Sequence, residues 1–139
     1  MTKTSLSNNI VILGAGGLIG SALFNHFKKE GKDFVCGTKR SGLSEDFLYL
    51  DTTDVQSVAE FPWDKFNIVI DCTGNIDYGN ENAVLQRNLE MNVLGPLRII
   101  DKLNAKHHYY YLSSHALLLP REQYNSYLLS KSYFEEIAS

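Results

Sequence analysis

A tyrosine, a lysine and a serine near the end of the chain are the first residues whose types and spacing could do chemistry. Tyr127 is the only one of the eight tyrosines with a lysine four positions later, Lys131. On a helix both side chains share one face, where the ammonium would favour the ionised phenol and allow proton exchange near neutral pH. Ser114 lies thirteen residues before Tyr127, at the end of a predicted strand. We therefore predict an acid–base site, and the alternative is that Tyr127 and Lys131 lie on a solvated helix face.

A glycine-rich segment, residues 14–20 (GAGGLIG), lies between a predicted strand and a predicted helix. Glycine permits positive φ and close approach of the backbone to a ligand, and a helix N-terminus offers unpaired N–H groups to a pyrophosphate. This context predicts a dinucleotide site, and the alternative is a glycine-rich turn that holds no ligand. The residues predicted to contact the dinucleotide here are Gly14, Gly16, Gly17, Leu18, Ile19 and Gly20.

Strand-like and helix-like patterns alternate along the chain, which predicts an α/β fold with a parallel sheet. The predicted strands are residues 10–14, 33–37, 47–50, 67–72 and 107–112. The predicted helices are residues 17–29, a short one near 54–60, a long one over 81–104, and one from about 122 to the end. Gly31 ends the first helix. Right-handed crossovers favour a Rossmann-type doubly wound sheet with strand order 3-2-1-4-5.

The length of 139 residues and the hydrophobic content of 44% predict one globular domain, residues 1–139. The net charge of −3 is spread without basic runs, which argues against nucleic acid as a partner. Glycines break the apolar run at residues 10–19, which argues against export and membrane insertion. Cys36 and Cys72 fall in predicted strands and are expected to be buried and unbridged, which fits a reducing, cytoplasmic setting. No histidine spacing indicates a metal site.

The spacing Gly14-x-x-Gly17-x-x-Gly20 and the pair Tyr127-x-x-x-Lys131 together resemble the short-chain dehydrogenase/reductase superfamily. The resemblance is to its extended type, the NAD(P)-dependent epimerases, dehydratases and reductases of nucleotide sugars, and it covers residues 10–131. Further segments resemble family landmarks in the same order. These are Asp51 and Thr52 after the third strand, Cys72, Thr73 and Gly74 after the fourth, Asn92 in the long helix, and Ser114 after the fifth.

The resemblance implies a role for each of these positions. Tyr127 would exchange a proton with the substrate oxygen, Ser114 would hydrogen-bond that oxygen, and Lys131 would also bind the nicotinamide ribose. Asp51 would bind the adenine amino group, and the segment 72–74 would lie along the cofactor. The implied function is an NAD(P)-dependent enzyme acting on an alcohol or ketone carbon, with a nucleotide sugar as the substrate class. Reduction, epimerisation and dehydration stay open, because all three begin with the same hydride transfer.

Asn92 also has an argument from local chemistry. Pro96 has no N–H to donate to the Asn92 carbonyl, so the long helix is expected to kink there. In the family such a carbonyl holds a water that links the lysine to solvent, and the alternative is a kink that serves packing alone. The apolar stripe of this helix is expected to be mostly core, and it comprises Leu85, Leu89, Val93, Leu97 and Ile100. Met91 and Leu94 would widen this apolar surface, and the resemblance allows a homodimer through helices four and five of the family.

Two departures from the family limit what the resemblance implies. Leu117, Leu118 and Leu119 stand where many sugar-modifying members have an aromatic residue followed by glycine. The chain ends eight residues after Lys131, so the C-terminal substrate-binding part is expected to be missing. The rival interpretation is a dinucleotide-binding module without turnover, either a sensor or the N-terminal part of a larger enzyme.

The end of the second strand predicts which dinucleotide is preferred. NAD specificity needs a carboxylate there, about 20 residues past the glycine turn, and Asp33 lies at the wrong end of the strand. Thr38, Lys39 and Arg40 stand at the correct end, where the two cations could meet a 2′-phosphate. NADP is therefore predicted in preference to NAD, and the alternative is that these cations are ordinary loop charges.

Overall fold

The computed structural model describes residues 7–139, so residues 1–6 of the predicted domain lie outside the described part. Its strands are β1 (Asn9–Leu13), β2 (Phe34–Lys39), β3 (Phe47–Tyr49), β4 (Ile68–Asp71) and β5 (His108–Tyr111). Its α-helices are α1 (Leu18–Glu30), α2 (Val55–Glu60), α3 (Asn82–Leu89), α4 (Gly95–Lys102) and α5 (Ser126–Ala138). A π-helical turn, Glu90–Leu94, joins α3 to α4, and short 3₁₀ turns span Trp63–Lys65, His115–Leu118 and Arg121–Gln123.

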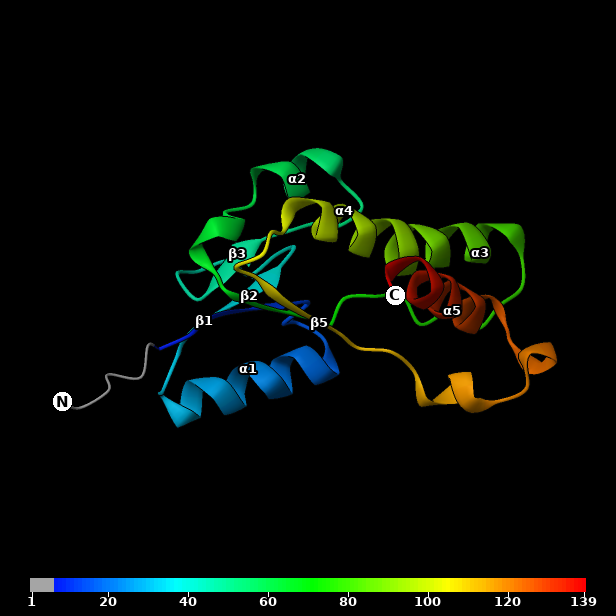
Figure 1. The fold of residues 1–139 in the computed structure, drawn as a ribbon, viewed down its shortest axis with the longest axis horizontal. Coiled ribbons are helices and arrows are strands. Elements are labelled where there is room, and N and C mark those ends of the chain that lie inside the picture. The colour runs from blue at the N-terminus through cyan, green and yellow to red at the C-terminus, as the bar shows by residue number, and fades with distance from the viewer. Residues whose placement is uncertain (1–6) are drawn as a thin grey trace.

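The strands form one parallel sheet in the order β3-β2-β1-β4-β5, which confirms the predicted Rossmann-type topology. Helix α1 lies against one face of the sheet, and α2 and α4 lie against the other (Figure 1). Alternate residues of β1 point to opposite faces, so Ile10 and Ile12 pack with Phe24 of α1, whereas Val11 and Leu13 pack with the α2 and α4 side. All the strands run in the same direction, so their carboxyl ends lie at one edge of the sheet.

The carboxyl ends of the first two strands differ from the predicted ends, and ligands of parallel sheets bind at this edge. β1 ends at Leu13, because Gly14 has a φ of +73° and cannot continue the strand. β2 continues past the predicted end at residue 37 and includes Thr38 and Lys39, which pair with β3. The two residues therefore have fixed positions in the sheet instead of lying in a loop. Helix α1 ends at Gly31 in the left-handed conformation, as predicted.

The predicted helix over 81–104 is interrupted by the π-helical turn, in which the N–H of Gly95 donates to the carbonyl of Glu90. A π turn takes more residues per turn than an α-helix, so the buried face recurs every four residues, at Val84, Asn88, Asn92 and Pro96. The long helix is therefore irregular just before Pro96, in the form of this π turn, and the kink expected there stays a prediction.

The same turn corrects the predicted apolar stripe, because it changes which residues face the core beyond it. Ile99 is fully buried, whereas Ile100 of the predicted stripe is exposed. Val93 is buried as predicted, and Leu85, Leu89 and Leu97 are half-buried. A regular period of 3.6 residues could not anticipate this change of phase.

The last helix begins later than predicted, at Ser126 instead of near residue 122. The side chain of Asn125 caps α5 by accepting a hydrogen bond from the N–H of Leu128 (3.0 Å). Residues 121–123 form a separate 3₁₀ turn after Pro120. The cap fixes the start of the helix, and the first buried turn of α5 therefore contains Tyr127.

Gly20 is the position in the turn where a side chain would do most damage to the fold. A Cβ there would overlap the carbonyl oxygen of Gly14, whereas a Cβ on Gly16 would meet only the Lys39 side chain, at 3.9 Å. We expect Gly20→Ala to lower the free energy of unfolding by at least about 2 kcal/mol in urea titrations, and Gly16→Ala to change it by less than about 0.5 kcal/mol. Equal stability of the two variants would contradict this account of the turn.

Candidate dinucleotide and acid–base site

The glycine turn is held in place by the end of β2. The N–H of Gly14 donates to the hydroxyl of Thr38 (3.1 Å), and the N–H of Ala15 donates to the Thr38 carbonyl (3.0 Å). Gly37, one residue earlier, leaves room for the Ala15 methyl group, because a Cβ there would lie 2.6 Å from it. Buried Thr38 therefore shapes the turn with its side chain, a role that the sequence did not indicate.

A pocket of about 390 Å³ opens beside this turn, at the carboxyl edge of the sheet. The predicted cofactor residues that line it are Gly14, Gly16, Gly17, Thr38, Lys39, Arg40, Asp51, Thr52, Cys72, Thr73 and Gly74. Ser41, Leu50 and Met91 also line it and were not predicted. The pocket thus gathers segments that are distant in sequence and that the sequence analysis had selected separately.

The remaining predicted cofactor residues lie outside the pocket lining. Leu18 and Ile19 are exposed on the first turn of α1, so the backbone N–H groups there are what they can offer to a ligand. Gly20 is buried beneath the turn. Tyr127 and Lys131 lie on α5, and the Lys131 ammonium lies near Gly74 of the pocket lining.

The N-terminus of α1 fits a pyrophosphate. Gly17 is the N-cap, it makes no side-chain cap, and the first turn has no acidic residue. The partial positive charge of the helix therefore faces the pocket without a competing carboxylate. These features, with the absence of a side chain at Gly14 and Gly17, make the turn able to hold the phosphates of a dinucleotide.

Two cations and one carboxylate define the charges at the other end of the pocket. The Nζ of Lys39 lies 3.8 Å from the centre of the Phe47 ring, and Arg40 is exposed. The pKa of Asp51 is lowered, chiefly by a hydrogen bond from the Thr53 hydroxyl (2.7 Å) and also by the charge of Arg40. Asp33 lies at the opposite edge of the sheet, where it accepts a hydrogen bond from the N–H of Asn8 (2.8 Å).

Both cysteines are unbridged, as predicted. Cys36 is buried in β2 as predicted, whereas Cys72 is only half-buried and borders the pocket just after β4. Burial is the main cause that raises the pKa of the Cys72 thiol to about 11, and the neighbouring Asp71 adds to it. Cys72 is therefore a protonated thiol at neutral pH and acts as an apolar wall of the pocket.

The predicted pair on α5 is buried. Tyr127 is 9% exposed and Lys131 is 4% exposed, which rules out the alternative that they lie on a solvated face. The ammonium of Lys131 donates to the carbonyl of Leu112 (3.0 Å) and lies 4.4 Å from the centre of the Tyr111 ring. It lies 6.0 Å from the centre of the Tyr127 ring.

The protonation of Tyr127 differs from the sequence expectation. Its pKa is raised instead of lowered, because burial disfavours the phenolate and Tyr78 adds to the effect. A hydrogen-bonding interaction with the Ser114 side chain acts in the opposite direction. Ser114 itself accepts a hydrogen bond from the N–H of Ala116 (3.3 Å), so its position is fixed by the turn that follows β5.

The side chain of Asn92 makes hydrogen bonds of its own, in addition to the role predicted for its carbonyl. Its Oδ1 accepts from the N–H of Asn75 (2.8 Å), and its Nδ2 donates to the carbonyl of Asn75 (3.0 Å) and to the hydroxyl of Ser130 (3.1 Å). Asn92 therefore ties the π turn both to the loop after β4 and to α5.

A second pair one turn away repeats this pattern. The Nδ2 of Asn88 donates to the hydroxyl of Ser126 (2.9 Å) and to the carbonyl of Asp77 (2.9 Å). The Ser126 hydroxyl in turn donates to the carbonyl of Gly79 (2.5 Å). We call the pairs Asn88–Ser126 and Asn92–Ser130 the Asn–Ser ladder.

Sequence reasoning missed most of these supporting residues. Asn88 and Ser126 could have been found from the repeat of one polar residue type at positions i and i+4 on each of two helices, beside Asn92 and Ser130. Asp71, which is fully buried at the end of β4, carried no motif signal. Tyr78, whose ring lies edge-on to Tyr127 at 5.6 Å, lies in a loop that showed no pattern.

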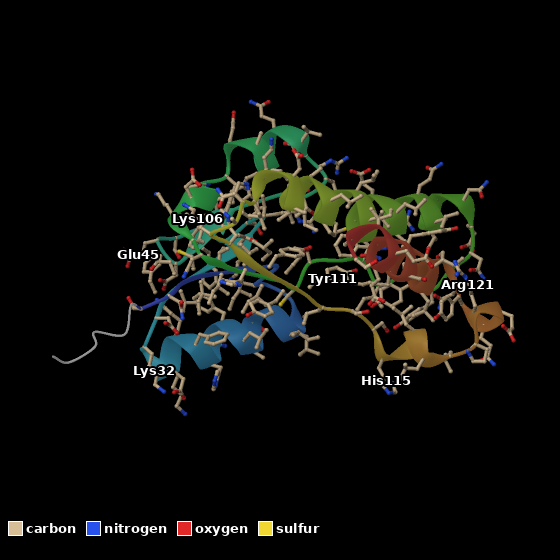
Figure 2. The ribbon with its side chains drawn as sticks, viewed as in Figure 1. Lys32, Glu45, Lys106, Tyr111, His115 and Arg121 are labelled. Atoms are coloured by element: carbon tan, nitrogen blue, oxygen red, sulfur yellow. The ribbon has the colours of Figure 1, made fainter. Side chains whose placement is uncertain are left out.

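The histidines stay apart from this site. His115 is exposed and lies with Arg121 on the outer segment that links β5 to α5 (Figure 2). Within residues 7–139, no three metal-ligating side chains of His, Cys, Asp or Glu come together. None of the helices in the described part of the chain is both long and apolar enough to span a membrane.

A comparison with known protein families shows to which family this chain belongs. The family model described as NAD dependent epimerase/dehydratase family matches residues 10–138. The chain belongs to this family. The resemblance to extended short-chain dehydrogenases/reductases is thereby confirmed. A comparison with curated protein sequences gave no match.

Solved structures share the fold at low sequence identity. An ADP-L-glycero-D-manno-heptose-6-epimerase from Helicobacter pylori is 17% identical with a TM-score of 0.79, covering 95% of this chain and 50% of that one. A short-chain dehydrogenase/reductase superfamily protein from Agrobacterium tumefaciens with bound NAD is 20% identical with a TM-score of 0.76, covering 93% and 43%. A short-chain dehydrogenase from Burkholderia cenocepacia in complex with NADP is 14% identical with a TM-score of 0.78, covering 94% and 63%. The chain therefore spans less than two thirds of each of these structures.

The Asn–Ser ladder can be tested by stability. Ser126→Ala would leave the buried Nδ2 of Asn88 with one acceptor fewer and the Gly79 carbonyl without the Ser126 donor. We expect the free energy of unfolding to fall by about 1–3 kcal/mol in chemical denaturation. The matched control is Ser21→Ala, because the Ser21 hydroxyl bonds only its own helix at an exposed position, and it should cost less than about 0.5 kcal/mol. An unchanged stability of Ser126→Ala would remove the ladder as a source of stability.

Proposed function

We propose that this chain binds NADP(H) in the pocket at the glycine turn and supplies a Ser-Tyr-Lys site, Ser114, Tyr127 and Lys131, that acts on an alcohol or ketone carbon. The observation that supports this most strongly is the contact between the two halves of the site at Gly74. Gly74 lines the pocket, and a Cβ on it would lie 2.9 Å from the Oδ1 of Asn92 and 3.7 Å from the Nζ of Lys131. A ligand that fills the pocket would therefore reach the acid–base residues.

The binding part of the proposal follows from the pocket lining. The turn Gly14–Gly17 and the N-terminus of α1 would hold the pyrophosphate, and Asp51 with Thr52 would lie at the adenine end. Cys72, Thr73 and Gly74 would lie along the path toward α5. When bound there, the nicotinamide supplies or accepts the hydride.

The preference for NADP(H) rests on the end of β2. Among the described residues that line the pocket, Asp51, which follows β3, is the one carboxylate, and its Oδ1 already accepts hydrogen bonds from Thr53. Lys39 is held over the Phe47 ring, so its charge is partly engaged there. Arg40 is exposed at the pocket and can offer two parallel N–H donors to a phosphate. Arg40 is therefore the main candidate for a 2′-phosphate contact.

The cofactor preference can be measured by titrating NADPH and NADH separately against the chain. We expect NADPH to bind at least about tenfold more tightly, and Arg40→Ala to remove most of that advantage while leaving NADH affinity nearly unchanged. Arg121→Ala is the control, because it removes the same charge at an exposed position that pairs with Glu136. Equal or tighter binding of NADH by the unmutated chain would overturn the preference.

The acid–base part assigns one task to each residue on this chain. Tyr127 donates its proton to the substrate oxygen during reduction or takes it during oxidation, and its raised pKa keeps the phenol ready as an acid at neutral pH. Ser114 donates a hydrogen bond to the same oxygen. Lys131 provides positive charge beside this oxygen and a donor for the ribose. Asn92 keeps the loop after β4 and α5 in register.

The acid–base assignment predicts a separation of turnover from binding. In a preparation with turnover, Tyr127→Phe should lower kcat by at least about a hundredfold, because only the proton-transferring hydroxyl is removed. The dissociation constant for NADPH should stay within about threefold. Tyr133→Phe removes a hydroxyl from an exposed position of the same helix and is the control. Activity of Tyr127→Phe within a few-fold of the unmutated protein would remove Tyr127 from the catalytic site.

The nucleotide sugar stays a proposal about substrate class, and it derives from the family resemblance. The homodimer and the cytoplasmic setting likewise stay predictions. Of the two residues expected to widen a dimer surface, Leu94 is exposed. Met91 lines the pocket instead, which corrects the expectation for this residue.

The rival function is a dinucleotide-binding module without turnover. A phenol with a raised pKa is a poor source of phenolate at neutral pH. The raised pKa of Tyr127 therefore favours this rival function for any reaction in which Tyr127 would have to act as the base. Tight NADPH binding together with no turnover on any alcohol or ketone would support this rival function.

A further inference from the structure

A buried carboxylate at the end of β4, Asp71, has no part in the proposed function. Asp71 is the last residue of β4, which lies between β1 and β5 in the sheet, and none of its surface is exposed. Its Oδ1 accepts hydrogen bonds from the N–H of Thr73 (2.9 Å) and from the Thr73 hydroxyl (2.5 Å), and its Oδ2 accepts from the Tyr109 hydroxyl (2.5 Å). An aspartate is rarely buried in this way without a partner of opposite charge.

Each of these donors is neutral, and together they match the ionised form of the side chain. A carboxylate can accept at both oxygens, whereas a carboxylic acid must donate from one of them. Burial raises the pKa of Asp71, and the hydrogen bonds from Thr73 and Tyr109 and the charge of Lys131 oppose that rise. Lys131 is the cation among the described residues whose charge acts on Asp71.

Lys131 is placed over the same strand ends. Its ammonium donates to the carbonyl of Leu112, whose own N–H donates to the backbone carbonyl of Asp71 (3.4 Å). It also lies over the ring of Tyr111, the residue that pairs with Asp71 in the sheet register. Figure 2 shows Tyr111 between the end of β5 and α5. Leu112 and Tyr111 thus connect the Lys131 ammonium to the strand end that carries Asp71, and the two side chains form no ion pair within 4.0 Å among the described residues.

The other titratable and polar groups around Asp71 and Lys131 are either neutral or exposed to water. Tyr111 and Tyr127 are neutral, since burial raises the pKa of each phenol. Asn88 and Asn92, on the helix packed against α5, are uncharged, and Cys72 stays a thiol because its pKa is raised. Glu135 is the second carboxylate that acts on Lys131, and it is exposed and bonded to Ser113.

We propose that Asp71 is the positioning residue for Lys131, whose buried negative charge keeps the ammonium protonated beside Tyr127. Asp71 acts through Lys131 and does not touch the substrate. Without it, the Lys131 ammonium would be left with a carbonyl, aromatic rings and the water-screened charge of Glu135, and it would lose its proton more readily. The catalytic use of the Lys131 charge rests on the proposed function. The coupling between Asp71 and Lys131 rests only on the contacts described above.

The test is the titration of Lys131 in the ligand-free chain. Selective ¹³C labelling of lysine gives one NMR signal for each lysine Cε, and the Lys131 signal is assigned by backbone connectivity. Asp71→Asn keeps the size of the side chain and removes its charge. We expect it to lower the midpoint of the Lys131 titration by about one pH unit or more, because an opposite charge at close range stabilises an ammonium to that extent.

Two control variants separate charge from packing. Glu135→Gln removes an exposed carboxylate on the same helix and should shift the midpoint by less than Asp71→Asn, because water screens that charge. Tyr109→Phe removes a hydrogen bond to Asp71 but leaves both charges in place, so the Lys131 midpoint should stay within about 0.3 units. An unchanged midpoint in Asp71→Asn, or a larger shift in Glu135→Gln, would overturn the proposal.

The reciprocal experiment keeps the proposal testable if Asp71→Asn fails to fold. Coupling between two groups is mutual, so Lys131→Met should raise the midpoint of the Asp71 carboxyl, followed by its ¹³C signal, by about the same number of units. An Asp71 midpoint that does not move in Lys131→Met would refute the coupling. Neither titration involves a dinucleotide or turnover. If the proposed function fails, these titration results are unaffected, and the two failures can therefore be distinguished.

Discussion

The Asn–Ser ladder is the interaction on which the arrangement of the candidate site depends. It consists of two side-chain hydrogen bonds one helical turn apart, Asn88 to Ser126 and Asn92 to Ser130, and all four residues are buried. Buried amides and hydroxyls must find partners, so only one sliding position of α5 against α3 and the π turn satisfies both pairs. The same asparagines also bond the backbone of the loop that follows β4. One network thereby places α5 and the wall of the dinucleotide pocket together.

The ladder follows from the spacing of four residues on each partner, because residues i and i+4 share one face of a helix. Ser126 and Ser130 have this spacing within α5, and Asn88 and Asn92 have it from the last turn of α3 into the π turn. The effect of the wider turn comes farther along the chain. Over eight residues a regular α-helix would drift away from the face of Asn88, whereas Pro96 is still buried with Asn88 and Asn92.

Polar groups are concentrated at the carboxyl edge of the sheet, where packing is otherwise apolar. Thr38, Asp71 and Lys131 are each buried, and each is bonded to the backbone or to a hydroxyl group. The cost of burying them is offset by these bonds, and the gain is rigidity at the place where a ligand would bind. The proposed roles of the glycine turn and of α5 both use this rigid edge.

The sequence by itself determined the alternation of strands and helices, the strand order, and the glycine turn, because these depend on local periodicity and on residues with special backbone freedom. It also selected most of the pocket lining, since residues just after parallel strands must meet at one edge. The tertiary structure alone decided the phase of the buried face beyond the π turn, the late start of α5 at its Asn125 cap, and the burial of both Asp71 and Lys131. It also decided the protonation of Tyr127, because a pKa depends on how much water and charge surround the group, and neighbours brought together by folding are invisible in a linear pattern.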